Sequence, residues 1–159
     1  DKQVVELEAG QSVNLNGLRV RALPADHCHR QVPNSIALAA SAAAVTVVHA
    51  GDNRLFRPPA LAGAQGCDIL IHSLYAYDEA YARPDALTWA PEMLEEQARF
   101  LAGLRPRVVL LTHLNEFRHP YPKVWRLAHA ALLKERLFGL APEVRCGVLA
   151  PGECYVYRK

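Results

Sequence analysis

The chain has 159 residues, of which 51% are hydrophobic and 21% are charged, so it can bury one compact core. This composition excludes an intrinsically disordered chain. The formal net charge of +2 arises from scattered Lys and Arg residues, which disfavours nucleic acid as a partner. Because no apolar run reaches the roughly 18 residues of a membrane helix and no signal peptide opens the chain, we expect no membrane association.

The four cysteines form no Cys-x-x-Cys pair. In a chain of this size they indicate reduced thiols and a cytoplasmic location, although their even number also permits two disulfides. The first residue is Asp1 rather than Met, which suggests a processing, proteolysis or expression boundary.

The first half of the chain predicts a series of short strands. Residues 18–23 alternate with period two, and Asn16-Gly17 before them is a typical tight hairpin turn. Apolar runs that end in polar or glycine-containing segments indicate the others. The expected strands are 4–7, 12–15, 18–23, 35–40, 44–49 and 68–72.

The second half alternates between helices and strands. Pro91 suits a first helical turn, and Leu94, Ala98, Leu101 and Leu104 form one apolar face, which predicts a helix over 91–104. In a second helix, the residues expected to face inward are Val124, Leu127, Ala131 and Leu132. The whole set predicts a single α/β (α+β) domain, 1–159, with a mixed sheet and helices on one face. The expected elements are helices 91–104 and 122–138 and strands 107–112, 144–149 and 153–157.

Three polar segments follow predicted strands. They are Asp26-His27-Cys28-His29, Gly51-Asp52-Asn53 and Thr112-His113. Imidazole and carboxylate groups are ligands for zinc and similar divalent metals, and a carboxylate can bridge two ions. Each segment also has an ordinary structural interpretation, because a histidine after a strand often makes only a structural hydrogen bond and Gly-Asp is a common turn.

In this order the segments resemble the second half of the metallo-β-lactamase superfamily. The resemblance rests on Asp26-His27 after a strand, Gly51-Asp52, the strand Asp68-Ile69-Leu70-Ile71-His72, and Thr112-His113-Leu114. It implies half of an αββα sandwich. The family signature His-x-His-x-Asp-His is absent, so the chain resembles a C-terminal part whose N-terminal half is missing.

The resemblance also implies a role for each matched residue. Asp52 would bridge two divalent metal ions, and His113 would bind the second of them. Zinc is the default metal, with iron or manganese as alternatives. His27, or else His29, would bind the first ion. Asp52 and His113 are then the catalytic residues, and His72 is expected in the core or beside the ligands because Ser73 replaces the glutamate of many relatives. Two ligands per ion are fewer than the usual three.

The function that the resemblance implies is a metal-dependent hydrolase, in which a metal-bound hydroxide attacks an ester, amide or phosphoester. An N-terminal half of the same fold or a second chain would complete the binuclear site, so we expect the chain alone to be inactive. The substrate would be a small molecule or phosphoester, and His119 and Tyr121 could contact it, since they follow His113 closely.

Two other functions fit the same residues. The missing signature favours a non-catalytic binding or scaffold module with a degenerate metal site. A nuclease of the same superfamily would need a basic groove, for which the small net charge gives little support.

Overall fold

The protein forms one mixed sheet with helices on one face. The computed structural model describes residues 4–26, 35–51, 53, 56, 59–74, 90–112, 114, 127–150 and 152–158. Its strands are β1 (Ser12–Leu15), β2 (Leu18–Pro24), β3 (Ile36–Ala42), β4 (Val45–His49), β5 (Ile69–Ser73), β6 (Val108–Thr112) and β7 (Arg145–Val148). The helices are α1 (Ala90–Leu104) and α2 (Leu127–Leu140).

The strands lie in the sheet in the same order as in the chain, from β1 to β7. Strands β1 to β4 pair antiparallel, with two-residue turns between β1 and β2 and between β3 and β4, whereas β4 to β7 pair parallel. Helix α1 connects β5 to β6, and α2 connects β6 to β7, as parallel pairs require a crossover. The predicted fold class, a mixed sheet with helices on one face, is confirmed.

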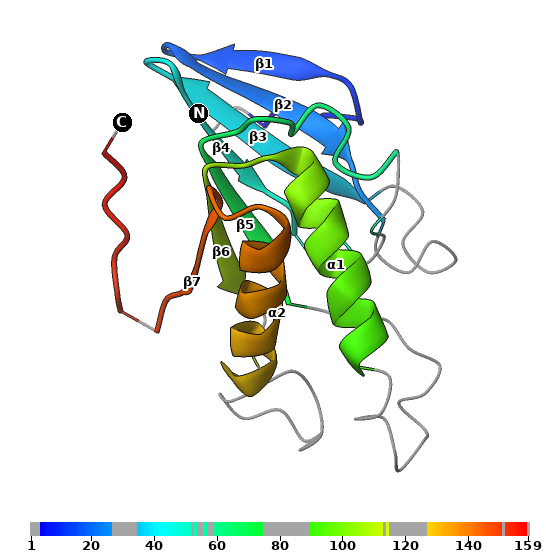
Figure 1. Ribbon diagram of the computed structural model, residues 1–159. Coiled ribbons are helices and arrows are strands. Elements are labelled where there is room, and N and C mark those ends of the chain that lie inside the picture. Colours follow the sequence, from blue (N-terminus) through cyan, green and yellow to red (C-terminus); the bar gives the residue numbers. More distant parts are fainter. Residues whose placement is uncertain are drawn as a thin grey trace.

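The main core lies between the sheet and the two helices. Figure 1 shows α1 and α2 side by side over one face of the sheet. The predicted apolar face of α1 is confirmed, because Leu94, Ala98, Leu101 and Leu104 are all buried. They pack with Leu70 of β5 and with apolar residues of the neighbouring strands.

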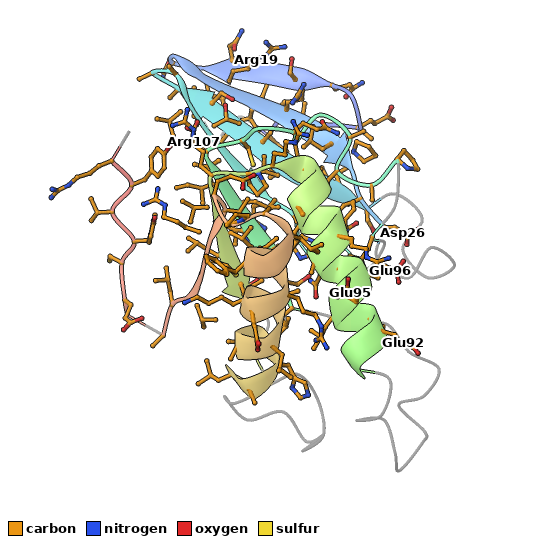
Figure 2. The ribbon with its side chains drawn as sticks, viewed as in Figure 1. Arg19, Asp26, Glu92, Glu95, Glu96 and Arg107 are labelled. Carbon is orange, nitrogen blue, oxygen red and sulfur yellow. The ribbon has the colours of Figure 1, made fainter. Side chains whose placement is uncertain are left out.

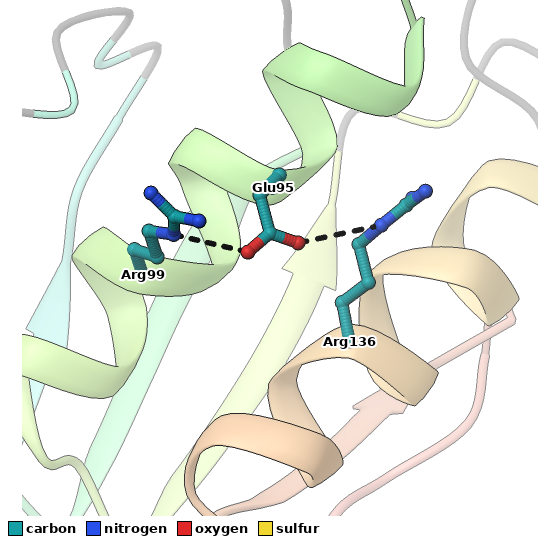
Figure 3. Close-up of polar contacts among 3 residues, drawn as sticks. All are labelled: Glu95, Arg99 and Arg136. Atoms are coloured by element: carbon teal, nitrogen blue, oxygen red, sulfur yellow. Dashed lines mark hydrogen bonds and ion pairs between the residues drawn. The ribbon is translucent and has the colours of Figure 1, made fainter.

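A carboxylate joins the two helices at their exposed side (Figure 3). One oxygen of Glu95 lies 3.0 Å from Nε of Arg99 in the same helix, and the other lies 3.6 Å from Nε of Arg136 in α2. Arg99 is mostly exposed, so water screens that pair and its contribution to stability is small. The Arg136 pair is more sheltered and links α1 to α2.

The predicted inward face of the second helix was wrong for the described residues, and Val124 lies outside them. Leu127 and Leu132 are 53% and 44% exposed, and Ala131 is also exposed. The buried residues are instead Ala130, Leu133 and Leu137. Apolar residues surround most of this helix, so the sequence pattern alone left its orientation ambiguous, and packing against α1 decides it.

The opposite face of the sheet, the outer face, has a smaller apolar cluster. Ile69, Val108 and Leu110 are buried there, and Tyr155 and Tyr157 of the C-terminal segment pack over them. The Tyr157 hydroxyl donates to Oδ1 of Asp68 over 2.8 Å. Strands were predicted at 4–7 and 153–157, but both segments lack regular structure, because neither pairs with a neighbouring strand. Among the residues with assigned structure, no helix has the length and apolarity to cross a membrane.

Candidate functional site

Five strands, β2, β4, β5, β6 and β7, end at the same edge of the sheet, and we call the part of it formed by the first four the carboxyl edge. It is formed by Pro24, His49, Ser73 and Thr112, the last residues of β2, β4, β5 and β6. β2 and β4 are both antiparallel to β3, so they point the same way, and β5 and β6 are parallel to β4. The three predicted ligand segments therefore all leave the sheet at this edge.

The predicted site residues themselves lie outside the described part of the chain. This holds for His27, His29, Asp52, His113, His119 and Tyr121. Among the residues that the structure does describe, no three His, Cys, Asp or Glu side chains come together as a possible metal site. The ligand assignments therefore stay predictions, and the described neighbours of these residues define the geometry of the edge.

Asn53 links two of the ligand segments. Its side chain is fully buried, and its Oδ1 accepts a hydrogen bond from the backbone amide of Asp26 over 3.0 Å. Asp26 precedes His27 in the chain, and Asn53 follows Asp52. Figure 2 shows Asp26 at the end of β2. A buried amide group thus joins the segment after β2 to the segment after β4.

A second contact shapes the turn before Asp52. The amide of Gly51 donates to Nδ1 of His49 over 3.1 Å, and Gly51 has a φ of 59°, a conformation that glycine adopts readily. His49 is the last residue of β4 and is exposed. It lies on the outer face because alternate residues of β4 point to opposite sides, and buried Val48 faces the helices.

His72 is buried at the end of β5, as the sequence predicted. Its Nδ1 lies 2.7 Å from the Ser73 carbonyl oxygen, which can only accept, so Nδ1 carries the proton. Nε2 is then the unprotonated nitrogen. The Gln97 amide nitrogen also donates to the Ser73 carbonyl over 3.0 Å, and its 3.2 Å approach to Nδ1 is a contact rather than a second bond.

Burial lowers the pKa of His72 from 6.5 to about 4, against a smaller opposing effect of its bond to Ser73. The rings of Phe56 and Phe100 lie 6.0 and 6.3 Å from the imidazole and keep water away. Within the described residues, Nε2 of His72 and Oγ of Ser73 are buried without a hydrogen-bond partner. Buried polar atoms normally form hydrogen bonds. These two atoms at the end of β5 are therefore available to hydrogen-bond a further polar group beside the carboxyl edge.

Two residues that shape this edge were not singled out from the sequence. The sequence pattern placed Asn53 only within the polar segment that follows the strand 44–49. Gln97 lies three residues after Leu94 and directly before Ala98, which places it on the apolar face of α1, and a buried amide there signals a polar partner beneath. For Asn53 no comparable local signal exists, because its partner is 27 positions away.

Comparison with solved structures shows a shared fold. Igni18, a metallo hydrolase from the archaeon Ignicoccus hospitalis, has a TM-score of 0.62 and 22% identity, over 94% of this chain and 58% of that one. CmlA, a diiron β-hydroxylase from Streptomyces venezuelae, has a TM-score of 0.61 and 14% identity, over 93% of this chain and 33% of that one. The chain thus spans less than two thirds of either protein.

Comparison of sequences is more specific. A search of curated proteins finds no match. Residues 1–114 match the family described as the beta-lactamase superfamily domain, and this match spans β1 to β6 and the whole carboxyl edge. The chain therefore belongs to the beta-lactamase superfamily.

Proposed function

We propose that this chain carries half of the active site of a metal-dependent hydrolase. Asp52 and His113 are the central ligands, with His27 or His29 as the third group. The observation that carries the proposal is the common edge at which β2, β4 and β6 end, because these strands precede the three ligand segments. Family membership supports it, and one similar structure is a metallo hydrolase.

The neighbours of Asp52 suit a rigid ligand. Gly51 is held by His49, and Asn53 is buried and bonded to Asp26. A site that must hold ions at fixed positions needs ligands whose backbone is fixed from both sides. We therefore assign the bridging carboxylate to Asp52, with the segment from Asp26 bringing His27 or His29 to the same ions.

The donor set of imidazole and carboxylate groups fits zinc, and equally iron or manganese. When bound, divalent ions would supply a nucleophile at neutral pH and polarise the bond to be hydrolysed, in an ester, amide or phosphoester. We propose two zinc ions, with iron as the first alternative because one similar structure is a diiron enzyme. His119 and Tyr121 are proposed to contact the substrate.

We further propose that a second half of the fold completes the site. Asp52 and His113 with one further histidine give two ligands per ion, which is one fewer than catalytic zinc usually has. The outer face supports a partner there, since Leu38 is 42% exposed and Val47 and Ile71 are only partly buried. The partner is an N-terminal half of the same fold or a second chain, and the 159-residue chain alone should be inactive.

The proposed compartment is the cytoplasm. Burial raises the pKa of the thiol of Cys67 to about 12 and that of Cys146 to about 11. Thiols of this kind are unreactive and suit reduced, structural cysteines.

The test uses the complete protein and measures bound metal as well as hydrolysis. Elemental analysis should give about two divalent ions per chain, and Asp52→Ala should abolish both metal retention and hydrolysis of phosphodiester and thioester substrates. Glu96→Ala removes an exposed carboxylate of α1 and should change neither. Full metal content in Asp52→Ala would refute the ligand assignment. A metal-free wild-type protein would favour the scaffold function, and hydrolysis of nucleic acid alone would favour the nuclease.

A further inference from the structure

The structure contains a hollow at the end of β2 opposite to the carboxyl edge. It has a volume of about 240 Å³ and opens on the helix-covered side of the sheet. Small residues leave it unfilled, since Ala39 and Ser41 of β3 form its floor, and the segment around Gly63 and Gly66 forms a wall. A Cβ atom added at Gly66 would meet no atom within 4 Å.

Two arginines line this hollow. Arg19 and Arg21 are two positions apart in β2, so both side chains point to the same face, and their Cα atoms are roughly 7 Å apart. The Arg21 guanidinium donates to the Gly63 carbonyl over 2.5 Å, and a Cβ at Gly63 would lie 3.2 Å from its Nη2. Glycine at position 63 therefore lets the guanidinium pack flat against the backbone and fixes its orientation.

The positive charge of the hollow is not balanced within the described structure. Neither Arg19 nor Arg21 forms an ion pair with a described carboxylate, and no Asp or Glu is among the described residues that line the hollow. Two like charges that line one hollow repel each other, and an anion between them would remove the repulsion and be attracted by both.

Neutral donors complete the lining. Ser41 and Thr46 hydroxyls are 2.9 Å apart, and this bond uses one of their two protons, which leaves the other to donate. The Gln65 side-chain oxygen accepts from the Gly63 amide over 2.9 Å, which leaves its amide nitrogen as a donor beside the hollow. The lining thus offers guanidinium, hydroxyl and amide donors and few acceptors.

We propose that the Arg19–Arg21 hollow is a binding site for a phosphate group, either free or as the end of a small phosphate ester. Guanidinium groups bind phosphate oxygens through paired hydrogen bonds, and the volume lies below the roughly 300 Å³ at which sites for larger ligands begin. The site lies about 17 Å along β2 from the carboxyl edge, counting about 3.4 Å for each of five residues. It is therefore separate from the proposed metal site, and Figure 2 shows Arg19 and Asp26 at the two ends of this strand.

The test is titration calorimetry of the complete protein, stripped of metal with a chelator so that phosphate cannot bind to metal ions. Inorganic phosphate at low ionic strength should bind saturably to one site. A second titration uses glycerol phosphate. Tighter binding of glycerol phosphate than of inorganic phosphate would indicate a phosphate ester as the ligand, and the reverse would indicate free phosphate. Added sodium chloride should weaken both titrations, because exposed charges are screened.

Variants decide whether the hollow is responsible. Arg19→Ala and Arg21→Ala should each weaken phosphate binding at least about tenfold, the loss expected for one charged hydrogen bond. Arg145→Ala removes an exposed arginine of β7, five strands away, and should have no effect. The Arg19 side chain makes no hydrogen bond or ion pair within the described residues, so its truncation should not affect folding. Absence of saturable binding, or unchanged affinity in Arg19→Ala, would overturn the proposal.

Discussion

The buried side-chain oxygen of Asn53 accepts the backbone amide of Asp26 over 3.0 Å, and this bond joins the segments that follow β2 and β4. The two residues flank His27 and Asp52 in the chain. We therefore expect the alignment of the proposed ligands to depend on Asn53, which is not itself a proposed ligand.

Asn53→Ala should therefore lower both stability and metal affinity. Loss of the acceptor leaves the Asp26 amide unsatisfied, which costs about 1–3 kcal/mol of the free energy of unfolding in denaturant melts. Metal titration of the complete protein should show weaker binding as well. Asn14→Ala, at an exposed position in β1, is the matched control and should change neither quantity. Unchanged metal affinity despite the loss of stability would show that this bond does not align the ligands.

His72 should make the protein less stable in mild acid. Its folded pKa of about 4 lies below the unfolded value of 6.5, so between these values the unfolded state binds more protons, and stability falls as the pH decreases. The total loss is on the order of 3 kcal/mol. In His72→Asn, which keeps a donor near the Ser73 carbonyl, the free energy of unfolding should lose this dependence between pH 6.5 and 4.

The exposed His49 gives the matched control for this measurement. His49→Asn keeps an acceptor for the Gly51 amide and should retain the pH dependence of the wild type. If the free energy of unfolding of His72→Asn depends on pH as in the wild type, a group other than His72 causes the loss of stability in acid.

Substitutions in the turn between β3 and β4 should stabilise the protein. Ala43 and Ala44 have φ values of 46° and 64°, a left-handed conformation that is costly for alanine, whereas Asn16-Gly17 serves the first hairpin with the preferred residues. Ala43→Asn combined with Ala44→Gly should raise the free energy of unfolding by about 1 kcal/mol. Ala43→Val puts a β-branched side chain in the same conformation and should lower the melting temperature. If both changes shift stability in the same direction, backbone strain is not the cause.

Tyr157 should hold the C-terminal segment against the sheet. Burial and its hydrogen bond to the negative Asp68 both raise its pKa, so the folded state keeps the phenol proton above pH 10. Stability should then fall as the pH rises beyond 10, and absorbance at 295 nm should show one late-titrating tyrosine. Both signals should vanish in Tyr157→Phe and persist in Tyr155→Phe, whose ring packs on the same face.

The sequence predicted the elements whose pattern is local. Helix 91–104 was expected from Pro91 and its apolar spacing, and the structure begins it one residue earlier. The strand at 4–7 was wrong because a strand needs a neighbour, and pairing is not encoded in the segment itself.

The site was predicted to a similar degree. The strand ends that precede Asp52 and His113 were recognisable from short motifs. The bond from Asn53 to Asp26 was not, because it forms only when distant segments meet. The exposure of His49 was not predictable either, because it depends on which face of β4 the helices cover, and tertiary packing decides that.

The strand order also bears on how the chain acquires its shape. Because each strand pairs with the one made just before it, the sheet can grow by addition at a single edge. The meander from β1 to β4 pairs strands that follow each other directly in the chain, and its longest connection is 25–35, so we expect it to form early during synthesis on the ribosome. The parallel strands must wait for their helices, which should make docking of α1 and α2 the slow phase of refolding.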